Sequence, residues 1–390
     1  MSRQKLMIPG PVDLWEESLE VMAKPVMPHY GDEWIALYWE TIGLLKKVFQ
    51  TANDVYILPS SGSGAIDACV GSMFCTGEKV AAICNGGFMD RTIRVLGGYG
   101  IEVVRVESDW DRAADVDKLR HTLETQPDIA GVAVVANDTI TSVRNPVDQL
   151  ASLAHEFDLP IFVDAISGMG GYDLPMDAWD LDAVCVSSNK CLEGAPGLGI
   201  LSVSPRAWKL IDAKKGMRHH GWYTNLSVWK EHREDPAWSS WHPYPVTLAT
   251  GVILSLRASL KRIIEQETLQ GHWARYAWAQ HVVRTGLRNM GFTMFAPDDV
   301  ASPTVTTSWK RDDMEVSDFI KFMGREHGFM IAGVFGELDG KVFRIAHMGK
   351  ASTREYVLPF MIGVEDFVRR KGVNVPIGAS LVGLEGSGPS

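Results

Sequence analysis

The sequence predicts an α/β protein with a mostly parallel, seven-stranded sheet, helices on both faces of the sheet, and a smaller C-terminal α+β domain. The chain has 390 residues, beyond the size at which a single core stops growing. Hydrophobic residues make up 46% of it and charged residues 22%, which is ample material for a large core. Between about 54 and 204, short apolar runs alternate with helical patterns, as in βα units around a parallel sheet.

Seven short apolar or β-branched runs are the candidate strands of this sheet. Several are apolar throughout, as expected for strands that are covered on both faces. The runs are 55–58, 79–84, 102–106, 131–136, 160–163, 183–186 and 200–203. Ligands of an open α/β sheet bind at the carboxyl ends of its strands, so the loops after these runs are where we expect chemistry.

Helices are expected at 64–73, 116–125 and 146–157, where apolar residues recur at helical spacing. A long helical pattern after Pro245 continues past Trp273 and leads to the C-terminal domain. Strands of that domain are expected at 292–295, 304–308, 330–334 and 341–345. We therefore predict an N-terminal arm (1–20), a large domain (21–265) and a small domain (266–390).

The net charge and the cysteines indicate which kinds of ligand and cross-link to expect. A net charge of −10 without clustered Lys and Arg gives no basic surface for nucleic acid or anionic membranes. No segment approaches the roughly 20 apolar residues of a membrane span, so we expect a cytoplasmic protein that acts on small molecules. Five cysteines, mostly within apolar runs and without a CxxC pair, indicate reduced thiols rather than disulfides or a zinc site.

The first candidate site is the turn Ser60-Ser61-Gly62-Ser63-Gly64-Ala65, which follows a strand and opens a helix. Small residues let backbone N–H groups approach an anion, and the helix N-terminus adds partial positive charge. The turn therefore suits a phosphate, although a flexible strand-to-helix connection would have the same sequence pattern. It is neither a dinucleotide fingerprint, since the third glycine position is Asp67, nor a Walker loop.

Two further residues end predicted strands and carry ionisable groups. Asp164 closes an apolar run, where a carboxylate either caps a helix or pairs with a cation such as a protonated ring nitrogen. Lys190 follows another run among small residues. Desolvation there would lower its pKa, as a Schiff-base nucleophile requires, whereas most lysines at strand ends simply face solvent.

Together, in this order, the turn, Asp164 and Lys190 resemble the class V, fold-type I aminotransferases, close to the alanine–glyoxylate and serine–glyoxylate enzymes. The resemblance begins at Pro9-Gly10-Pro11 and covers nearly the whole chain. It implies pyridoxal 5′-phosphate (PLP) as cofactor, held by Lys190 through a Schiff base and by Asp164 at the pyridine nitrogen.

The resemblance also implies the other contacts of the cofactor. The segment from Asn137 to Val143 is a looser version of the family's E-[ST]-S-T-G-V, from which Ile140 and Ser142 depart. The implied contacts are Ser63, Gly64 and Ala65 at the phosphate, Phe88 stacked on the ring, Thr139 at its O3′ side, and Ile166 and Asn189.

Substrate and subunit contacts follow from the same resemblance. Gly10 would lie near the substrate, and Arg344, within a segment similar to K-x-x-R-I-G-x-x-G, would bind its carboxylate bidentately; a solvent-facing strand arginine is the alternative. Tyr244 and Thr247 resemble residues that reach the phosphate from the neighbouring subunit. A homodimer is therefore expected.

The implied reaction is transamination between a small amino acid, of the alanine or serine type, and glyoxylate or pyruvate. The segment Ser188-Asn189-Lys190-Cys191 also resembles 2-aminoethylphosphonate–pyruvate transaminases, for which Arg218, His219 and His220 would supply basic groups. Segments at 301–304 and 344–349 resemble pyridoxamine–pyruvate transaminase, which lacks the phosphate turn present here.

The residues present argue against two other interpretations. A sulfur-removing lyase would carry histidine where Asn189 stands, and a catalytically silent binding protein would lack Lys190 or Asp164, both of which are present. Four tryptophans in the stretch from Trp222 to Trp241 either line the entrance to the site or pack a dimer interface.

Overall fold

The computed structural model describes residues 4–217 and 221–384, so Arg218, His219 and His220 lie outside the described residues. All seven candidate strands join one sheet, which confirms the predicted architecture. Only β10 runs antiparallel to its neighbours; the other pairings are parallel. In sheet order the strands are β2 (Asp54–Pro59), β10 (Leu198–Val203), β9 (Ala183–Ser187), β8 (Ile161–Asp164), β5 (Ile129–Val135), β3 (Lys79–Cys84) and β4 (Glu102–Glu107).

Helices pack on this sheet because its central strands are buried along their length and need apolar cover on both faces. The Asp115 side chain caps one of these helices by accepting hydrogen bonds from the backbone N–H of Asp117 and Lys118. The helices of this part are α1 (Glu16–Met22), α2 (Asp32–Phe49), α3 (Gly62–Met73), α4 (Met89–Gly98), α5 (Val116–Thr125), α6 (Val147–Glu156), α7 (Pro205–Ala213) and α8 (Leu226–Glu234).

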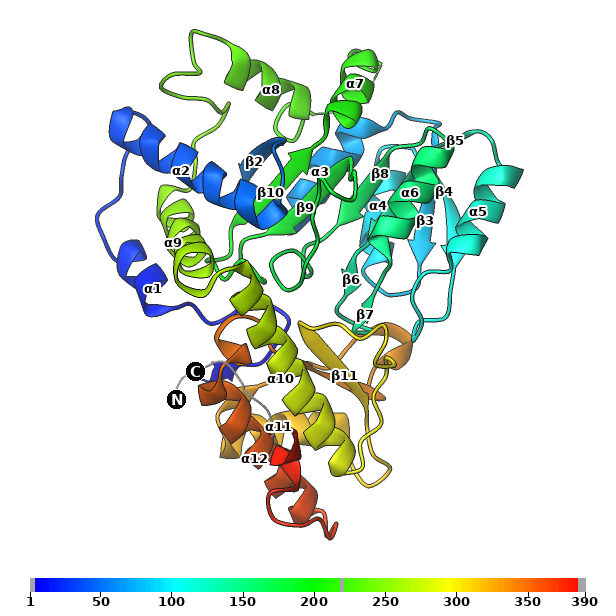
Figure 1. The fold of residues 1–390 in the computed structure, drawn as a ribbon, viewed down its shortest axis with the longest axis vertical. Coiled ribbons are helices and arrows are strands. Elements are labelled where there is room, and N and C mark those ends of the chain that lie inside the picture. The colour runs from blue at the N-terminus through cyan, green and yellow to red at the C-terminus, as the bar shows by residue number, and fades with distance from the viewer. Residues whose placement is uncertain (1–3, 218–220, 385–390) are drawn as a thin grey trace.

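The long helical pattern after Pro245 is interrupted in the structure. It consists of α9 (Thr250–Lys261), a π-helical turn η1 (Arg262–Glu267) and α10 (Leu269–Asn289). Thr268 has a φ of 64° and its hydroxyl accepts from the Gly271 N–H, so it starts a new helix. The stretch is thus helical over nearly its whole length, with one break at Thr268, and Arg262 in η1 pairs with residues of a buried ionic cluster. In Figure 1, α10 descends from the sheet to the C-terminal part of the molecule.

A second hydrophobic core lies around α10, α11 (Val316–Glu326) and α12 (Arg354–Arg370). Two small sheets complete it: β11 (Val305–Trp309) pairs antiparallel with β13 (Val342–Ala346), and β1 (Lys5–Leu6) pairs parallel with β12 (Phe329–Met330). The N-terminal arm thus joins the C-terminal core, where Met7 is buried. The exact domain division stays a prediction.

The expected strand at 292–295 was wrong. The N–H of Phe292 ends α10 by bonding to the carbonyl of Leu287, and only an isolated bridge between Met294 and Ser308 remains. The shorter elements are β6 (Asn137–Asp138), β7 (Val143–Arg144), η2 (Gly336–Leu338), η3 (Gly349–Ser352) and η4 (Ala379–Leu384). None of the helices in the described ranges has the length and apolar character needed to cross a membrane.

Candidate active site

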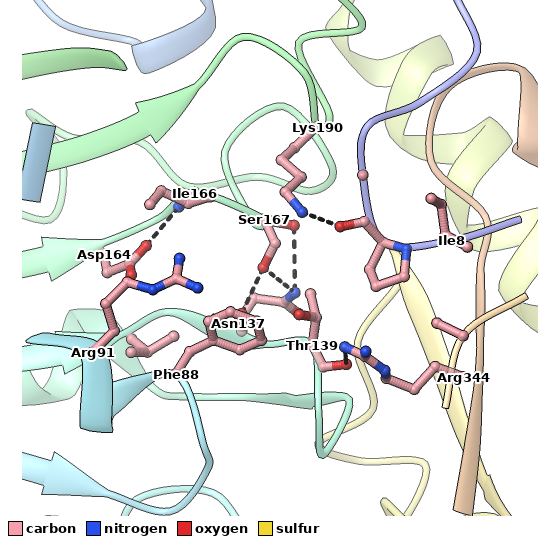
Figure 2. Close-up of a pocket in the computed structure, with 14 residues that line it drawn as sticks. Ile8, Phe88, Arg91, Asn137, Thr139, Asp164, Ile166, Ser167, Lys190 and Arg344 are labelled. Atoms are coloured by element: carbon pink, nitrogen blue, oxygen red, sulfur yellow. Dashed lines mark hydrogen bonds between the residues drawn. The ribbon is translucent and has the colours of Figure 1, made fainter. Parts of the chain in front are cut away.

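A cavity of about 300 Å³ lies at the carboxyl ends of β5 and β8, where the N-terminal arm and β13 meet the sheet. Seven residues that the sequence singled out line it together, and Figure 2 shows Lys190, Asp164 and Arg344 on three different sides. The lining residues are Ile8, Pro9, Gly10, Phe88, Arg91, Val135, Asn137, Thr139, Asp164, Ile166, Ser167, Lys190, Ala332 and Arg344.

Lys190 extends into the cavity from the turn after β9. Burial lowers the pKa of its amine to about 8, and Nζ donates a hydrogen bond to the carbonyl oxygen of Pro9. The next residue, Gly10, has a φ of +87°, and a Cβ added there would lie 2.5 Å from Lys190 Nζ. The left-handed backbone conformation favours glycine at this position, and an added methyl group would force the end of the Lys190 side chain to move.

Asp164 is the last residue of β8 and only 4% of it is exposed. Burial raises the pKa of its carboxyl to about 6, and Oδ1 accepts a hydrogen bond from the Ile166 N–H at 2.9 Å. Among the described residues no basic group lies within ion-pair distance of it. A buried carboxyl in this setting is suited to a ligand that brings its own positive charge.

Arg344 projects from β13 and its guanidinium is held by two carbonyl groups. Nε donates to Gly333 O at 2.9 Å and one terminal nitrogen donates to Thr139 O at 3.1 Å. Burial lowers the pKa of Arg344 to about 10, and it forms no ion pair within the described part of the chain. This fixed, unneutralised guanidinium can receive a carboxylate.

The loop after β5 contributes a residue that sequence reasoning did not single out. One carboxylate oxygen of Asp138 accepts the Phe88 N–H at 2.8 Å, and the other accepts those of Ile140 at 2.7 Å and Thr141 at 3.2 Å. Burial raises the pKa of this carboxyl. Asp138 thus fixes the backbone of Phe88, whose ring lines the cavity; an acidic residue just past a strand end was the available signal.

Asn137 was likewise missed as a lining residue. Its amide nitrogen donates to Ser167 Oγ at 3.0 Å and to Thr304 Oγ1 at 3.2 Å. Its Oδ1 is buried and has no partner in the described structure. A buried amide oxygen without a partner is costly, and here it belongs to a residue that lines a cavity.

Arg91, in the first turn of α4, is the third missed residue. Its guanidinium carbon lies 5.0 Å from the centre of the Phe88 ring, and Figure 2 shows the group beside Asp164. Within the described ranges it makes no ion pair. With Lys190 and Arg344 it gives the cavity three basic groups against one carboxyl, an excess that favours anionic ligands.

The proposed phosphate turn opens α3 next to the cavity rather than in its lining. Ser63, Gly64 and Ala65 lie in the first turn of the helix, which has no side-chain cap. The Gly64 N–H bonds to the Ser61 carbonyl at 2.9 Å, so the N–H groups before it are the ones that this helix start can offer to an anion. A Cβ added at Gly62 would lie 2.7 Å from Ile166 Cδ1. The helix start therefore abuts the cavity wall formed by Ile166.

Three further predicted contacts do not line the cavity of the single chain. Asn189 Oδ1 accepts a hydrogen bond from Ser187 within the lysine turn. Tyr244 is buried, and its hydroxyl accepts from Trp34 Nε1 at 2.6 Å. Thr247 is exposed. Their roles toward a cofactor stay predictions.

A buried ionic cluster supports the turn that carries Lys190. The fully buried Glu193, whose N–H bonds to the Lys190 carbonyl, accepts from Arg275 and from the Tyr276 hydroxyl, both at 2.8 Å, and also pairs with Arg262. These basic groups hold the pKa of the Glu193 carboxyl far below its usual range although burial opposes this. Arg275 also donates to the Gly349 carbonyl at 2.7 Å. The cluster thus joins the lysine turn, α10 and the turn after β13.

Comparisons with known proteins agree with this geometry. The sequence profile of the family described as Aminotransferase class-V matches residues 92–336. An uncharacterized aminotransferase of Methanocaldococcus jannaschii is 32% identical over 373 residues, 96% of this chain and 94% of the relative. Pyridoxamine–pyruvate transaminase of Mesorhizobium japonicum is 25% identical, with 95% and 93% covered. The crystal structure of alanine–glyoxylate aminotransferase from Nostoc superposes with a TM-score of 0.88 at 26% identity, with 95% and 96% covered. The chain therefore belongs to the class-V aminotransferases, enzymes of the PLP-dependent fold-type I group.

Proposed function

We propose that this chain transfers amino groups between a small amino acid and a small 2-oxo acid, with PLP held in the cavity described above. The observation that carries the proposal is the meeting of Lys190, at a lowered pKa, with Asp164 and Arg344 around one cavity. When bound, PLP supplies an aldehyde that joins the amino group of the substrate and a ring that withdraws electrons from Cα.

The residues present fit this cofactor. Asp164 offers a buried carboxyl that forms no ion pair in the described structure, although Arg91 lies near it, and a protonated ring nitrogen would offset the cost of its charge. Phe88 presents an aromatic ring for stacking and is held in place through Asp138. The start of α3 offers N–H groups to a phosphate, and Thr139 and Asn137 place polar groups at the remaining edge.

Two side chains of the protein would have separate roles in the reaction, one in substrate binding and one in proton transfer. Arg344 binds the α-carboxylate and fixes the orientation of Cα. The Lys190 amine would take the proton from Cα as a base and hold it on Nζ for return as an acid. A pKa near 8 suits both directions of transfer at neutral pH.

Alanine or serine as donor and glyoxylate or pyruvate as acceptor are the first candidates, favoured by the similarity to alanine–glyoxylate aminotransferase from Nostoc. Pyridoxamine is a second candidate donor, favoured by the similarity to the Mesorhizobium enzyme. The presence of a small-residue helix start for the phosphate argues for bound PLP instead. 2-Aminoethylphosphonate is the third candidate, since Arg91 leaves the cavity with a basic group to spare.

A homodimer is part of the proposal. Large apolar side chains are exposed on and near α2 and around α8, among them Tyr30 at 54% and Trp222 at 58%, and contiguous exposed apolar surface marks interfaces. The exposed tryptophans of the 222–241 stretch, Trp222, Trp238 and Trp241, would pack in that interface, with Thr247 facing the partner's site. Trp229 is buried within the chain. The cytoplasmic location stays a prediction.

The test is the visible spectrum of the purified protein during addition of L-alanine, L-serine, 2-aminoethylphosphonate or pyridoxamine. We expect the absorbance of bound PLP to be bleached by one donor and restored by glyoxylate or pyruvate. Lys190→Ala should lose the absorbance of the covalently held cofactor, while the exposed Lys47→Ala should keep it. A Lys190→Ala protein with full turnover would refute the assignment, and sedimentation of the active protein as a monomer would refute the dimer.

A further inference from the structure

A second cavity, of about 330 Å³, lies close to the active-site cavity but shares none of its lining residues. Its lining residues come from the loop after β4, from β11 and the segment before it, and from η2. They are Trp110, Asp111, Phe295, Trp309, Glu337 and Leu338. Its volume is in the range of small-molecule sites, which combine mostly apolar and aromatic walls with few polar groups.

Three of the six lining residues are aromatic. The rings of Phe295 and Trp309 lie 5.2 Å apart at an angle of 33°, and the backbone fixes both, because the Phe295 N–H bonds to Thr307 O at 3.0 Å and Trp309 pairs with Val342. Trp110 packs with Phe295 in one apolar cluster. The faces of such rings attract cations through the ring quadrupole.

The polar groups of the lining are both acidic. Glu337 forms no ion pair within the described residues, and Asp111 has only the guanidinium of its chain neighbour Arg112, at 3.9 Å. None of the lining residues is basic. The charge of this cavity is thus opposite to that of the active-site cavity, which Lys190 and Arg344 line.

We propose that this aromatic cavity binds a small organic cation, of the quaternary or alkylated ammonium class, with the rings of Trp110, Phe295 and Trp309 around the cation and Asp111 and Glu337 at its rim. Inorganic cations fit less well, because they give up a tighter hydration shell to meet aromatic faces. The site is independent of the transamination proposed above.

The cavity also touches the wall of the active site. A Cβ added at Gly87 would lie 3.8 Å from the Trp110 ring and 2.5 Å from Ile140 Cδ1, and Gly87 immediately precedes Phe88. A cation seated against Trp110 is therefore separated from the active-site cavity only by this packed layer.

The test is calorimetric titration of the PLP-loaded protein with choline, which is a quaternary ammonium and cannot condense with an aldehyde. The controls are 3,3-dimethylbutan-1-ol, its uncharged isostere, and sodium chloride at equal ionic strength. We expect saturable choline binding that is at least about fivefold tighter than that of the isostere. Absence of saturable binding, or equal affinity for the isostere, would overturn the proposal.

Variants locate the site. Trp309→Leu and Glu337→Gln should each weaken choline binding by about threefold or more, while Trp309→Phe, which keeps a ring, should lose less. Ile377→Ala, at an exposed position outside the cavity, should lose nothing. If Trp309→Leu does not fold, the comparison of Trp309→Phe with Glu337→Gln carries the test. Unchanged affinity in both of those variants would show that choline binds elsewhere.

Discussion

Asp164→Asn should change the stability of the protein in opposite directions with and without cofactor. In the cofactor-free protein, burial raises the Asp164 pKa from 3.8 to about 6. Above that pH the folded protein must keep a charged carboxylate buried, and this lowers its free energy of unfolding. An amide carries no charge to bury, and its oxygen can still accept the Ile166 N–H. The substitution should therefore stabilise the cofactor-free protein at pH 8.

The magnitude follows from the shift. A difference of about 2 pH units corresponds to about 3 kcal/mol. Because the pKa of this acid is raised in the folded state, its contribution to stability is fully present below pH 4 and is lost as pH rises to about 6. The gain of Asp164→Asn over wild type should therefore grow from near zero at pH 4 to about 3 kcal/mol above pH 6.

Urea unfolding of the cofactor-free proteins at pH 4, 6 and 8 measures this gain. Asp138→Asn is the matched control: its carboxyl is equally buried, but both oxygens accept backbone N–H groups, so the amide should destabilise. PLP affinity of Asp164→Asn should fall at least about tenfold, since a charge-assisted hydrogen bond contributes about 1.5–3 kcal/mol. A destabilised Asp164→Asn protein at pH 8, or unchanged PLP affinity, would refute the reasoning.

Three further substitutions test other contacts. Gly10→Ala should abolish activity, because its Cβ would lie 2.5 Å from Lys190 Nζ; borohydride trapping of the cofactor on the lysine measures the loss, and normal trapping would contradict it. Arg344→Gln should raise KM for amino and 2-oxo acids by about tenfold or more while the PLP dissociation constant stays the same; an unchanged KM would place the carboxylate elsewhere. Glu193→Gln should lower unfolding free energy by about 3 kcal/mol, because the buried guanidinium groups of Arg262 and Arg275 lose one of the two counter-charges that they share and keep the other, Glu267; urea unfolding at neutral pH checks this, and a loss below about 1 kcal/mol would count against a tight buried pair.

Sequence reasoning succeeded where local pattern and tertiary structure agree. The strand 79–84 and the helix 116–125 have the predicted ends, because an apolar run and an Asp115 cap mark them locally. Asp164 and Lys190 were found because each follows a buried strand, and parallel strands bring their carboxyl ends to one edge of the sheet.

The same reasoning failed where distant contacts decide the structure. Nothing near Thr268 shows that Arg262 turns inward to Glu193, so the helix break was missed. Arg91 lies in a polar helix turn like many others, and its place in the cavity depends on how α4 meets Phe88. The burial of Tyr244 against Trp34 depends on packing between residues 210 positions apart.

The ionic cluster around Glu193 also bears on how the molecule unfolds. Glu193 belongs to the part of the chain that packs on the seven-stranded sheet, whereas Arg275 and Tyr276 lie on α10 and bind the Gly349 turn of the second core. Separation of the two cores would leave several charges without partners in a poorly solvated contact, at a cost of several kcal/mol. The cores should therefore melt together, in a single cooperative transition, and a partly unfolded enzyme with an intact sheet and a free C-terminal part should not accumulate.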